Sequence, residues 1–189
     1  MPKLAITGAS GGGKSTLVAA LAAQGHHTVA EVGRQLVADE LEAKGSALPW
    51  EDREAFARLL FERSISAFDQ APADGWVFFD RSFIEAIAYC AVIGMAVPER
   101  WGEQAAARRF DTPVLVCPPW AEIFTRDSER RHDFEQACLD HAANVTAYEA
   151  AGYELIEIPR APLADRVAFV LDTLATLNGR QPSNPREKR

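Results

Sequence analysis

Residues 8–16 read Gly-Ala-Ser-Gly-Gly-Gly-Lys-Ser-Thr and directly follow an apolar run at residues 4–6. This stretch matches the phosphate-loop pattern Gly-x-x-x-x-Gly-Lys-Ser, which joins a strand to a helix. Glycines permit positive φ angles and let backbone N–H groups approach phosphate oxygens without interference from a Cβ atom. The helix that begins near Lys14 directs its unpaired N–H groups and its positive dipole end at the same anion. The stretch therefore predicts a nucleoside triphosphate site rather than a simple glycine-rich turn.

The side chains of this loop have separate expected roles. Lys14 supplies a positive charge for the β- and γ-phosphates, and the Ser15 hydroxyl is placed to ligate Mg²⁺. Backbone groups of the loop supply the remaining contacts. The predicted nucleotide-binding residues are Gly8, Gly11, Gly12, Gly13, Lys14, Ser15 and Thr16.

The composition is that of a globular protein. The chain has 189 residues, of which 48% are hydrophobic and 25% are charged, as in ordinary globular domains. This length predicts a single domain with its own core, over residues 1–177. From residue 178 onward the sequence is polar and contains Pro182 and Pro185. This composition predicts a disordered tail over residues 178–189.

Charge and cysteine content indicate the class of partner and the compartment. The formal net charge is −7, whereas a nucleic-acid-binding protein needs a basic face, so nucleic acid is not the expected partner. Cys90, Cys117 and Cys138 lie far apart without a Cys-x-x-Cys motif, which favours reduced thiols. The sequence shows no secretion signal and no apolar run near the ~20 residues that span a bilayer. We therefore expect a cytoplasmic protein with no membrane partner.

Short apolar runs alternate with longer amphipathic stretches along the chain. Apolar runs of this kind are typical of parallel strands that helices cover on both faces. The pattern predicts a doubly wound α/β fold, in which ligands bind beyond the carboxyl ends of the strands. The expected strands are 3–7, 28–31, 76–80, 113–117 and 154–158. The expected helices are 14–24, 33–44, 50–69, 82–93, 99–108, 121–150 with a break, and 163–177.

Local signals predict where several helices begin and end. Ser82 and Glu85 have the spacing of a capping box at the start of one helix, and Gly94 is placed to end it. Pro49 suits the first turn of the helix expected from residue 50.

Asp80, at the end of the strand expected over 76–80, is a candidate metal ligand. Four apolar residues followed by an aspartate form the Walker-B arrangement, whose carboxylate helps to hold Mg²⁺ directly or through water. Arg81 would then project into the same crevice. Asp80 could instead cap the next helix, but Ser82 is better placed for that role. Ser15 and Asp80 are therefore the predicted metal ligands.

Glu31 and Arg34 are candidate substrate-binding residues. Glu31 ends an expected strand, and a carboxylate at that position could accept a proton from a substrate hydroxyl as the hydroxyl attacks the γ-phosphate. Arg34 could hold an anionic group of the substrate. The alternative is an ordinary helix start, with Glu31 favourable near the helix dipole and Arg34 in solvent.

Arg126 and Arg130 are four residues apart and would share one helical face. Arginines carried by a closing lid stabilise the charge that spreads over a phosphoryl group during its transfer. The alternative is a solvated helix in which these arginines pair with nearby carboxylates. Spacing alone does not separate the two interpretations.

The motifs above occur in an order that resembles a known family. The loop at 8–16 is followed by Glu31-Val32-Gly33-Arg34, by Asp80-Arg81-Ser82, by the arginine-rich stretch 126–131 and by a Tyr-Glu-Ala-Ala-Gly-Tyr-Glu-Leu segment at 148–155. Together they resemble the small P-loop AAA-like ATPases related to the NadR kinase domain, and more broadly the nucleoside and nucleoside-monophosphate kinases. This resemblance covers the chain except for its tail.

The resemblance implies a three-layer fold with a five-stranded parallel sheet in the order 2-3-1-4-5, helices on both faces and an arginine-bearing lid. It also implies that ATP and Mg²⁺ are the cofactors, since no Asn-Lys-x-Asp motif is present to read guanine. By the same resemblance, Glu31 contacts the acceptor hydroxyl, and Asp80 and Arg81 approach metal and substrate. The loop with Arg160 lies against the adenine, and Arg126 and Arg130 belong to the lid.

Three functions remain open on the sequence. A kinase would transfer the γ-phosphate of ATP to a nucleoside-like or other acceptor that bears a hydroxyl or a phosphate. Lys14, Glu31, Asp80, Arg126 and Arg130 would then be its catalytic residues. A nucleotide-dependent regulatory ATPase would instead act on a protein or effector and would need no acceptor pocket. An ATPase that acts on nucleic acid is disfavoured by the acidic composition.

Overall fold

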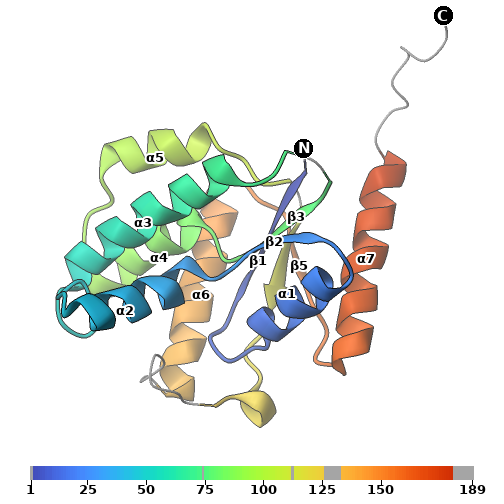
Figure 1. Cartoon of the computed structure of the whole chain (residues 1–189), viewed down its shortest axis with the longest axis horizontal. Helices are drawn as coiled ribbons and strands as arrows, with labels where there is room; N and C mark the ends of the chain where they lie inside the picture. Colours follow the sequence, from blue (N-terminus) through green and yellow to red (C-terminus); the bar gives the residue numbers. More distant parts are fainter. Residues whose placement is uncertain (1, 74, 112, 126–132, 181–189) are drawn as a thin grey trace, which may run out of the picture.

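The computed structural model describes residues 2–73, 75–111, 113–125 and 133–180. A five-stranded parallel sheet occupies its centre, in the order β2-β3-β1-β4-β5, as predicted (Figure 1). The strands are β1 (Lys3–Gly8), β2 (His27–Val29), β3 (Val77–Asp80), β4 (Val114–Cys117) and β5 (Leu155–Glu157).

Strand register brings the candidate residues to one edge of the sheet. In β1, Ile6 is level with Asp80 of β3 on one side and with Leu115 of β4 on the other. The phosphate loop leaves β1 at Gly8, two residues beyond that level. Because parallel strands end at the same edge of a sheet, the loop lies next to Asp80 and Arg81.

Helices cover both faces of the sheet (Figure 1). Alternate residues of a strand point to opposite faces. Leu4 and Ile6 therefore pack with α1 and α7, whereas Ala5 packs with α3, α4 and α6. The helices are α1 (Lys14–Ala23), α2 (Val32–Ala43), α3 (Arg53–Gln70), α4 (Phe83–Ile93), α5 (Glu99–Ala106), α6 (Phe134–Ala150) and α7 (Leu163–Arg180).

Aromatic side chains fill the core between the sheet and the α3–α5 side. Trp101 of α5 is 1% exposed and stacks on Phe61 of α3, with ring centroids 4.2 Å apart. Phe68, Phe83 and Phe110 make edge-on or tilted contacts beside this pair. Helix α5 lies toward the end of the sheet at which β1 begins, away from the loop that joins β1 to α1 (Figure 1).

Several predicted boundaries are wrong, each for a local reason. Helix α3 begins at Arg53 rather than at residue 50, because the Asp52 carboxylate accepts a hydrogen bond from the backbone N–H of Ala55 at 2.9 Å and caps the helix there. Strand β2 ends at Val29, and Glu31 is the residue that precedes the first turn of α2. Glu31 is therefore a helix N-cap position and not the last residue of a strand.

The predicted long segment 121–150 is interrupted as expected. A short 3₁₀ turn spans Ala121–Ile123, and α6 begins after Asp133, whose carboxylate accepts from the N–H of Gln136 at 2.9 Å. Helix α7 continues to Arg180, three residues past the predicted end at 177. Within the described residues, no helix is both long enough and apolar enough to cross a membrane.

Candidate nucleotide and acceptor site

The phosphate loop adopts the backbone geometry that its glycines predict. Gly8, Gly11 and Gly13 have φ angles of 120°, 76° and 74°, which side chains rarely tolerate. A Cβ atom at Gly8 would overlap the carbonyl of Cys117 in β4, so a glycine is required where β1 turns into the loop. Helix α1 begins at Lys14, and its first N–H groups face the loop.

Lys14 is buried against its own loop. Its side chain is 4% exposed, and Nζ donates to the carbonyl of Gly8 at 3.2 Å and to that of Ala9 at 2.6 Å. Burial and, to a smaller extent, the Arg81 cation together lower the pKa of Lys14 to about 8, even though Asp80 and Glu31 oppose the shift. The ammonium group therefore lies near the carboxylates of Asp80 and Glu31, but its charged form is destabilised by desolvation. A bound polyanion would offset this desolvation.

Ser15 and Asp80 form a pair that suits a magnesium ion. The Ser15 hydroxyl donates to Asp80 Oδ2 at 2.7 Å, and Asp80 Oδ1 is buried without a described partner. Burial raises the pKa of Asp80, and Glu31 adds to this rise. Among the described residues, no cluster of three His, Cys, Asp or Glu side chains could hold a metal. A cation at this pair would therefore need phosphate oxygens and waters as its other ligands, which Mg²⁺ favours.

Glu31 and Arg81 form an ion pair beside Asp80. Arg81 Nε donates to Glu31 Oε1 at 3.0 Å, and the two side chains are 18% and 20% exposed for Arg81 and Glu31. Burial opposes ionisation of Glu31, but Arg81, Lys14 and Arg34 outweigh it and hold the pKa of this carboxyl below its usual range. Arg81 has a φ of 73°, and its N–H donates to the Ile6 carbonyl at 3.0 Å. Such strain in a non-glycine residue is typical of functional sites.

A large cavity of about 590 Å³ lies against the phosphate loop. Lys14, Glu31 and Arg34 are among the residues that line it. Trp120, which follows β4, and Arg166 of α7 also line it. Its size, its glycine-rich floor and its basic groups suit a nucleotide. The lining residues are Gly11, Gly13, Lys14, Ser15, Thr16, Glu31, Arg34, Trp120, Ile123, Thr125, Ala161, Pro162, Leu163 and Arg166.

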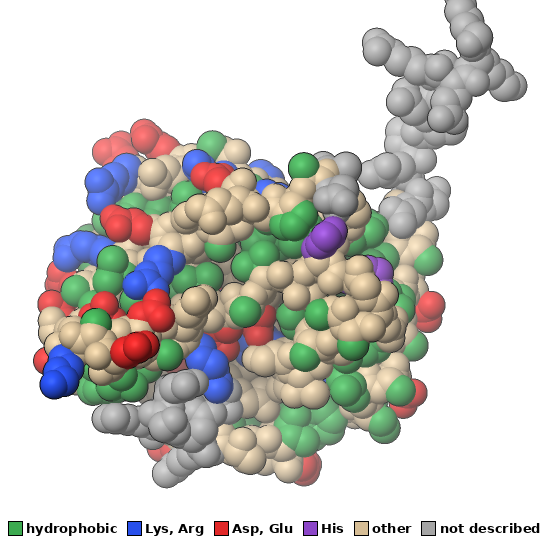
Figure 2. Space-filling model, viewed as in Figure 1, with side chains coloured by type: hydrophobic (Ala, Val, Ile, Leu, Met, Phe, Trp, Pro, Cys, Tyr) green, Lys and Arg blue, Asp and Glu red, His purple; other side chains and the backbone are tan. Residues whose placement is uncertain are grey.

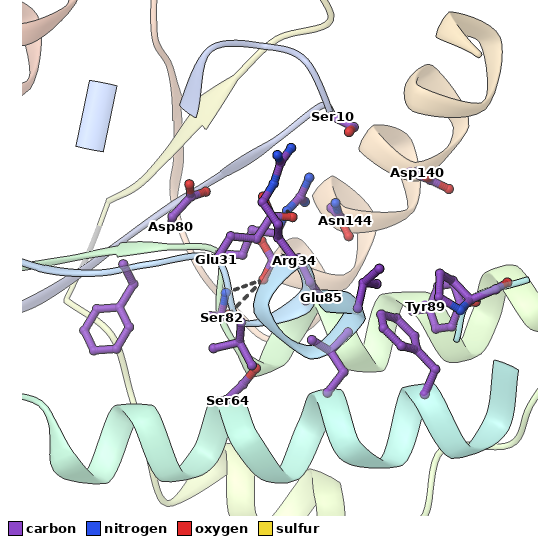
Figure 3. Close-up of a pocket in the computed structure, with 18 of the residues that line it drawn as sticks. Ser10, Glu31, Arg34, Ser64, Asp80, Ser82, Glu85, Tyr89, Asp140 and Asn144 are labelled. Atoms are coloured by element: carbon purple, nitrogen blue, oxygen red, sulfur yellow. Dashed lines mark hydrogen bonds and ion pairs between the residues drawn. The ribbon is translucent and has the colours of Figure 1, made fainter. Parts of the chain in front are cut away.

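A second cavity of about 210 Å³ is also lined by Glu31 and Arg34 (Figure 3). Its walls are largely apolar and come from α2, α3, β3 and α4, with Val37, Phe56, Leu60, Phe79 and Tyr89 among them. Polar groups lie at separate points around it: Ser64 on α3, and Asp140 and Asn144 on α6. Figure 3 shows these groups around the cavity, with Glu31 and Arg34 near Asp80. Glu31 and Arg34 therefore line both cavities.

A buried hydrogen-bond network supports the floor of the second cavity. The Glu85 carboxylate accepts from Thr7 of β1 at 2.6 Å, from the Ser82 N–H at 2.8 Å and from the Tyr148 hydroxyl of α6 at 2.9 Å. Ser82 and Glu85 form the predicted capping box of α4, and Gly94 ends that helix. The network thus ties α6 to β1 and to the Asp80–Arg81 corner.

The structure brings most of the predicted site residues together, with three exceptions. Arg126 and Arg130 lie outside the described residues. Arg160 does not line the nucleotide cavity; its Nε donates to the carbonyl of Pro119 at 2.9 Å, while its neighbours Ala161 and Pro162 do line the cavity.

Sequence reasoning missed functional candidates on helices. Arg166 touches the phosphate loop from α7, and Ser64 and Asn144 line the second cavity. None of them belongs to a motif, so only the packing of their helices reveals them. The sequence around Trp120 does not indicate whether this side chain packs in the core or lines a pocket.

Comparison with known proteins identifies the family. The sequence profile of the AAA domain family matches residues 3–166. The chain belongs to this family. No curated protein matches the sequence of this AAA-domain protein.

Solved structures resemble the fold of this AAA-domain protein. A NadR protein in complex with NR superposes with a TM-score of 0.71 at 19% identity, over 97% of this chain and 53% of that chain. The chain thus spans about half the length of that NadR structure. Deoxyadenosine kinase from M. mycoides gives 0.61 at 12% identity, over 92% and 99% of the two chains. Shikimate kinase from Acinetobacter baumannii gives 0.58 at 16% identity, over 96% of each chain.

Proposed function

We propose that this protein is an ATP-dependent kinase that transfers the γ-phosphate to a hydroxyl group of a small molecule. The observation that carries this proposal is that two cavities share Glu31 and Arg34 beside the phosphate loop. A regulatory ATPase needs a nucleotide cavity but no second cavity next to it for an acceptor. The likeness of the fold to deoxyadenosine kinase and shikimate kinase also supports a kinase.

The phosphate loop would hold the nucleotide in the larger cavity. Lys14 and the N–H groups of the loop would bind the phosphates, and Ser15 and Asp80 would hold Mg²⁺. A bound Mg²⁺ would neutralise charge on the phosphate oxygens as the bond to the leaving oxygen breaks. Arg126 and Arg130 would stabilise the same charge from a lid, and the loop with Arg160 would lie near the base.

Glu31 would orient the acceptor. In the transfer, the acceptor oxygen forms a bond to the γ-phosphorus, the bond to the β,γ-bridging oxygen breaks, and the acceptor proton leaves. The Glu31 carboxylate is ionised and faces the cavity, so it can accept a hydrogen bond from the attacking hydroxyl and receive its proton. Arg34 and Arg81 would hold further oxygens of the acceptor.

The second cavity suits an acceptor with a flat apolar part and a polar part. Phe56, Leu60 and Tyr89 offer apolar contact, while Ser64 and Asn144 offer hydrogen bonds. A nucleoside-like molecule has this division between a ring and hydroxyl groups. We therefore propose a nucleoside-like acceptor.

We propose a cytoplasmic location and a small-molecule rather than a nucleic-acid partner. Cys90, Cys117 and Cys138 are free thiols, and two of them are buried, which fits a reducing cytoplasm. On the face drawn in Figure 2, the described acidic and basic side chains are intermixed and form no continuous basic patch. This arrangement and the acidic composition argue against nucleic acid as a partner.

The experiment is a screen of nucleosides, nucleoside monophosphates and other metabolic alcohols, with ATP and Mg²⁺, in which release of ADP is the readout. The expected result is that one chemical class of acceptor stimulates ADP release. The Glu31→Gln variant should bind ATP with an affinity within about twofold of the wild type and lose at least about a hundredfold in transfer. If Glu31→Gln transfers phosphate at the wild-type rate, the role given to Glu31 is wrong. If a protein partner alone stimulates ADP release, the regulatory alternative replaces the kinase.

A further inference from the structure

Arg166 of α7 reaches across to the phosphate loop and is almost fully buried. Its side chain is 4% exposed. Nη2 donates to the carbonyl of Gly12 at 3.0 Å and to the thiol of Cys117 at 3.1 Å, and Nη1 donates to the carbonyl of Gly13 at 3.4 Å. The guanidinium also lies 5.8 Å from the ring centroid of Trp120. Arg166 therefore contacts the phosphate loop and is also one of the residues that line the nucleotide cavity.

The charge of Arg166 has no counter-ion in the described parts of the chain. Its hydrogen-bond partners are two carbonyls and a thiol, and no described carboxylate lies within ion-pair distance of it. Burial raises the pKa of the Cys117 thiol despite the nearby cations, so this partner is neutral as well. Arg166 Nε is buried without any partner among the described residues. A buried cation without an anion is costly unless a ligand brings the missing charge.

We propose that Arg166 is a nucleotide-positioning residue whose counter-charge is the polyphosphate bound in the adjoining loop. This inference rests on the nucleotide site of the proposed function but not on the identity of the acceptor. Two physical effects support it: the geometry that Arg166 imposes on the loop, and the positive charge that it places beside the loop in the lining of the nucleotide cavity.

The geometric effect follows from the planarity of the peptide bond. A trans peptide holds its C=O and the next N–H in opposite directions. Because Arg166 holds the carbonyl of Gly12 on its own side, the N–H of Gly13 is directed away from it. The carbonyl of Gly13 is shared between Arg166 and the N–H of Leu17, which donates to it at 3.2 Å, so the N–H of Lys14 is directed by α1 and Arg166 together. Glycines offer little resistance to rotation of a peptide plane. Arg166 therefore prevents the Gly12 carbonyl from turning toward the phosphates.

The test separates charge from hydrogen bonding with matched variants. Arg166→Gln keeps a donor for a carbonyl but removes the charge, and Arg166→Lys keeps the charge. Arg109→Gln is the control, because Arg109 also donates to two carbonyls, of Ala151 and Gly152, and lies over the Tyr153 ring, away from both cavities. The measurements are the Kd of ATP with Mg²⁺ by calorimetry, and the Tm of each protein with and without the nucleotide.

Arg166→Gln is expected to weaken ATP binding at least about tenfold, while the Tm of the nucleotide-free protein stays within about 2 °C of the wild type or rises. Arg166→Lys should recover part of the affinity, and Arg109→Gln should leave the Kd unchanged. A wild-type Kd for Arg166→Gln would overturn the inference. A second result would also overturn the inference: a large fall in the Tm of nucleotide-free Arg166→Gln, together with a loss of ATP affinity in Arg166→Lys equal to that in Arg166→Gln. That result would mean that Arg166 only stabilises the fold.

The same measurements keep this inference apart from the proposed function. If the wild type binds ATP and Arg166 has the stated effect, but no small molecule is phosphorylated, then the kinase proposal fails and the inference on Arg166 stands. If the wild type does not bind ATP with Mg²⁺, both are overturned.

Discussion

Nucleotide binding should be coupled to the uptake of a proton by Lys14, and the number of protons taken up per nucleotide should increase between pH 7 and pH 9. The pKa of Lys14 falls from 10.5 to about 8 because the ammonium is buried next to Arg81. A shift of this size corresponds to about 3 kcal/mol against the charged form. That cost is fully present below pH 8, and it is relieved as the pH rises from 8 to 10.5. Polyphosphate binding requires the charged form and restores a high pKa.

The magnitude follows from the titration of a group with a pKa of about 8. Lys14 is about 10% neutral at pH 7, about 50% neutral at pH 8 and about 90% neutral at pH 9. Binding of ADP with Mg²⁺ should therefore take up about 0.1, 0.5 and 0.9 proton at these three pH values. Calorimetry in two buffers with different ionisation enthalpies gives the number of protons directly, and pH 7 serves as the internal control. Tight binding with no proton uptake at pH 9 would refute this account of Lys14.

Further changes test the metal pair and the core. Asp80→Asn removes the carboxylate that pairs with Ser15, so a Mg²⁺ titration should show a fall in turnover of at least about a hundredfold; an unchanged Mg²⁺ dependence would exclude Asp80 as a ligand. Tyr148→Phe removes a donor to the buried Glu85 and should lower the free energy of unfolding by about 1–3 kcal/mol in urea. If Tyr148→Phe and the wild type had the same free energy of unfolding, this hydrogen bond would not contribute to stability. Trp101→Ala should cost about 3–5 kcal/mol of stability yet leave the Kd of ATP unchanged, because Trp101 packs far from the loop; a changed Kd would show coupling through the core.

The parts of the site that local sequence encodes were predictable. Residues 8–16 carry the loop, and the apolar run that ends in Asp80 carries the Walker-B position. The Ser82 and Glu85 capping box fixes the start of α4 within a few residues. Each of these signals depends on neighbours in the chain, so no tertiary contact is needed to read it.

The contacts that join distant segments were not predictable. The ion pair of Glu31 with Arg81 depends on the φ of 73° at Arg81, which tertiary contacts impose against local preference. The placement of Arg166 depends on how α7 is rotated against a loop some 150 residues away, and no pattern in α7 encodes that rotation. Ser64 and Asn144 are ordinary residues on amphipathic helices, and only the meeting of α3 and α6 around one cavity gives them a role.

The fate of the γ-phosphate tests the central claim most directly. The protein would be incubated with γ-labelled ATP, Mg²⁺ and an extract of small metabolites, and the labelled products would then be separated. A kinase with Glu31 between its two cavities should place the label on an organic acceptor in the wild type, and Glu31→Gln should not do so. Label found in inorganic phosphate alone, at the same rate with and without the metabolites, would contradict the account.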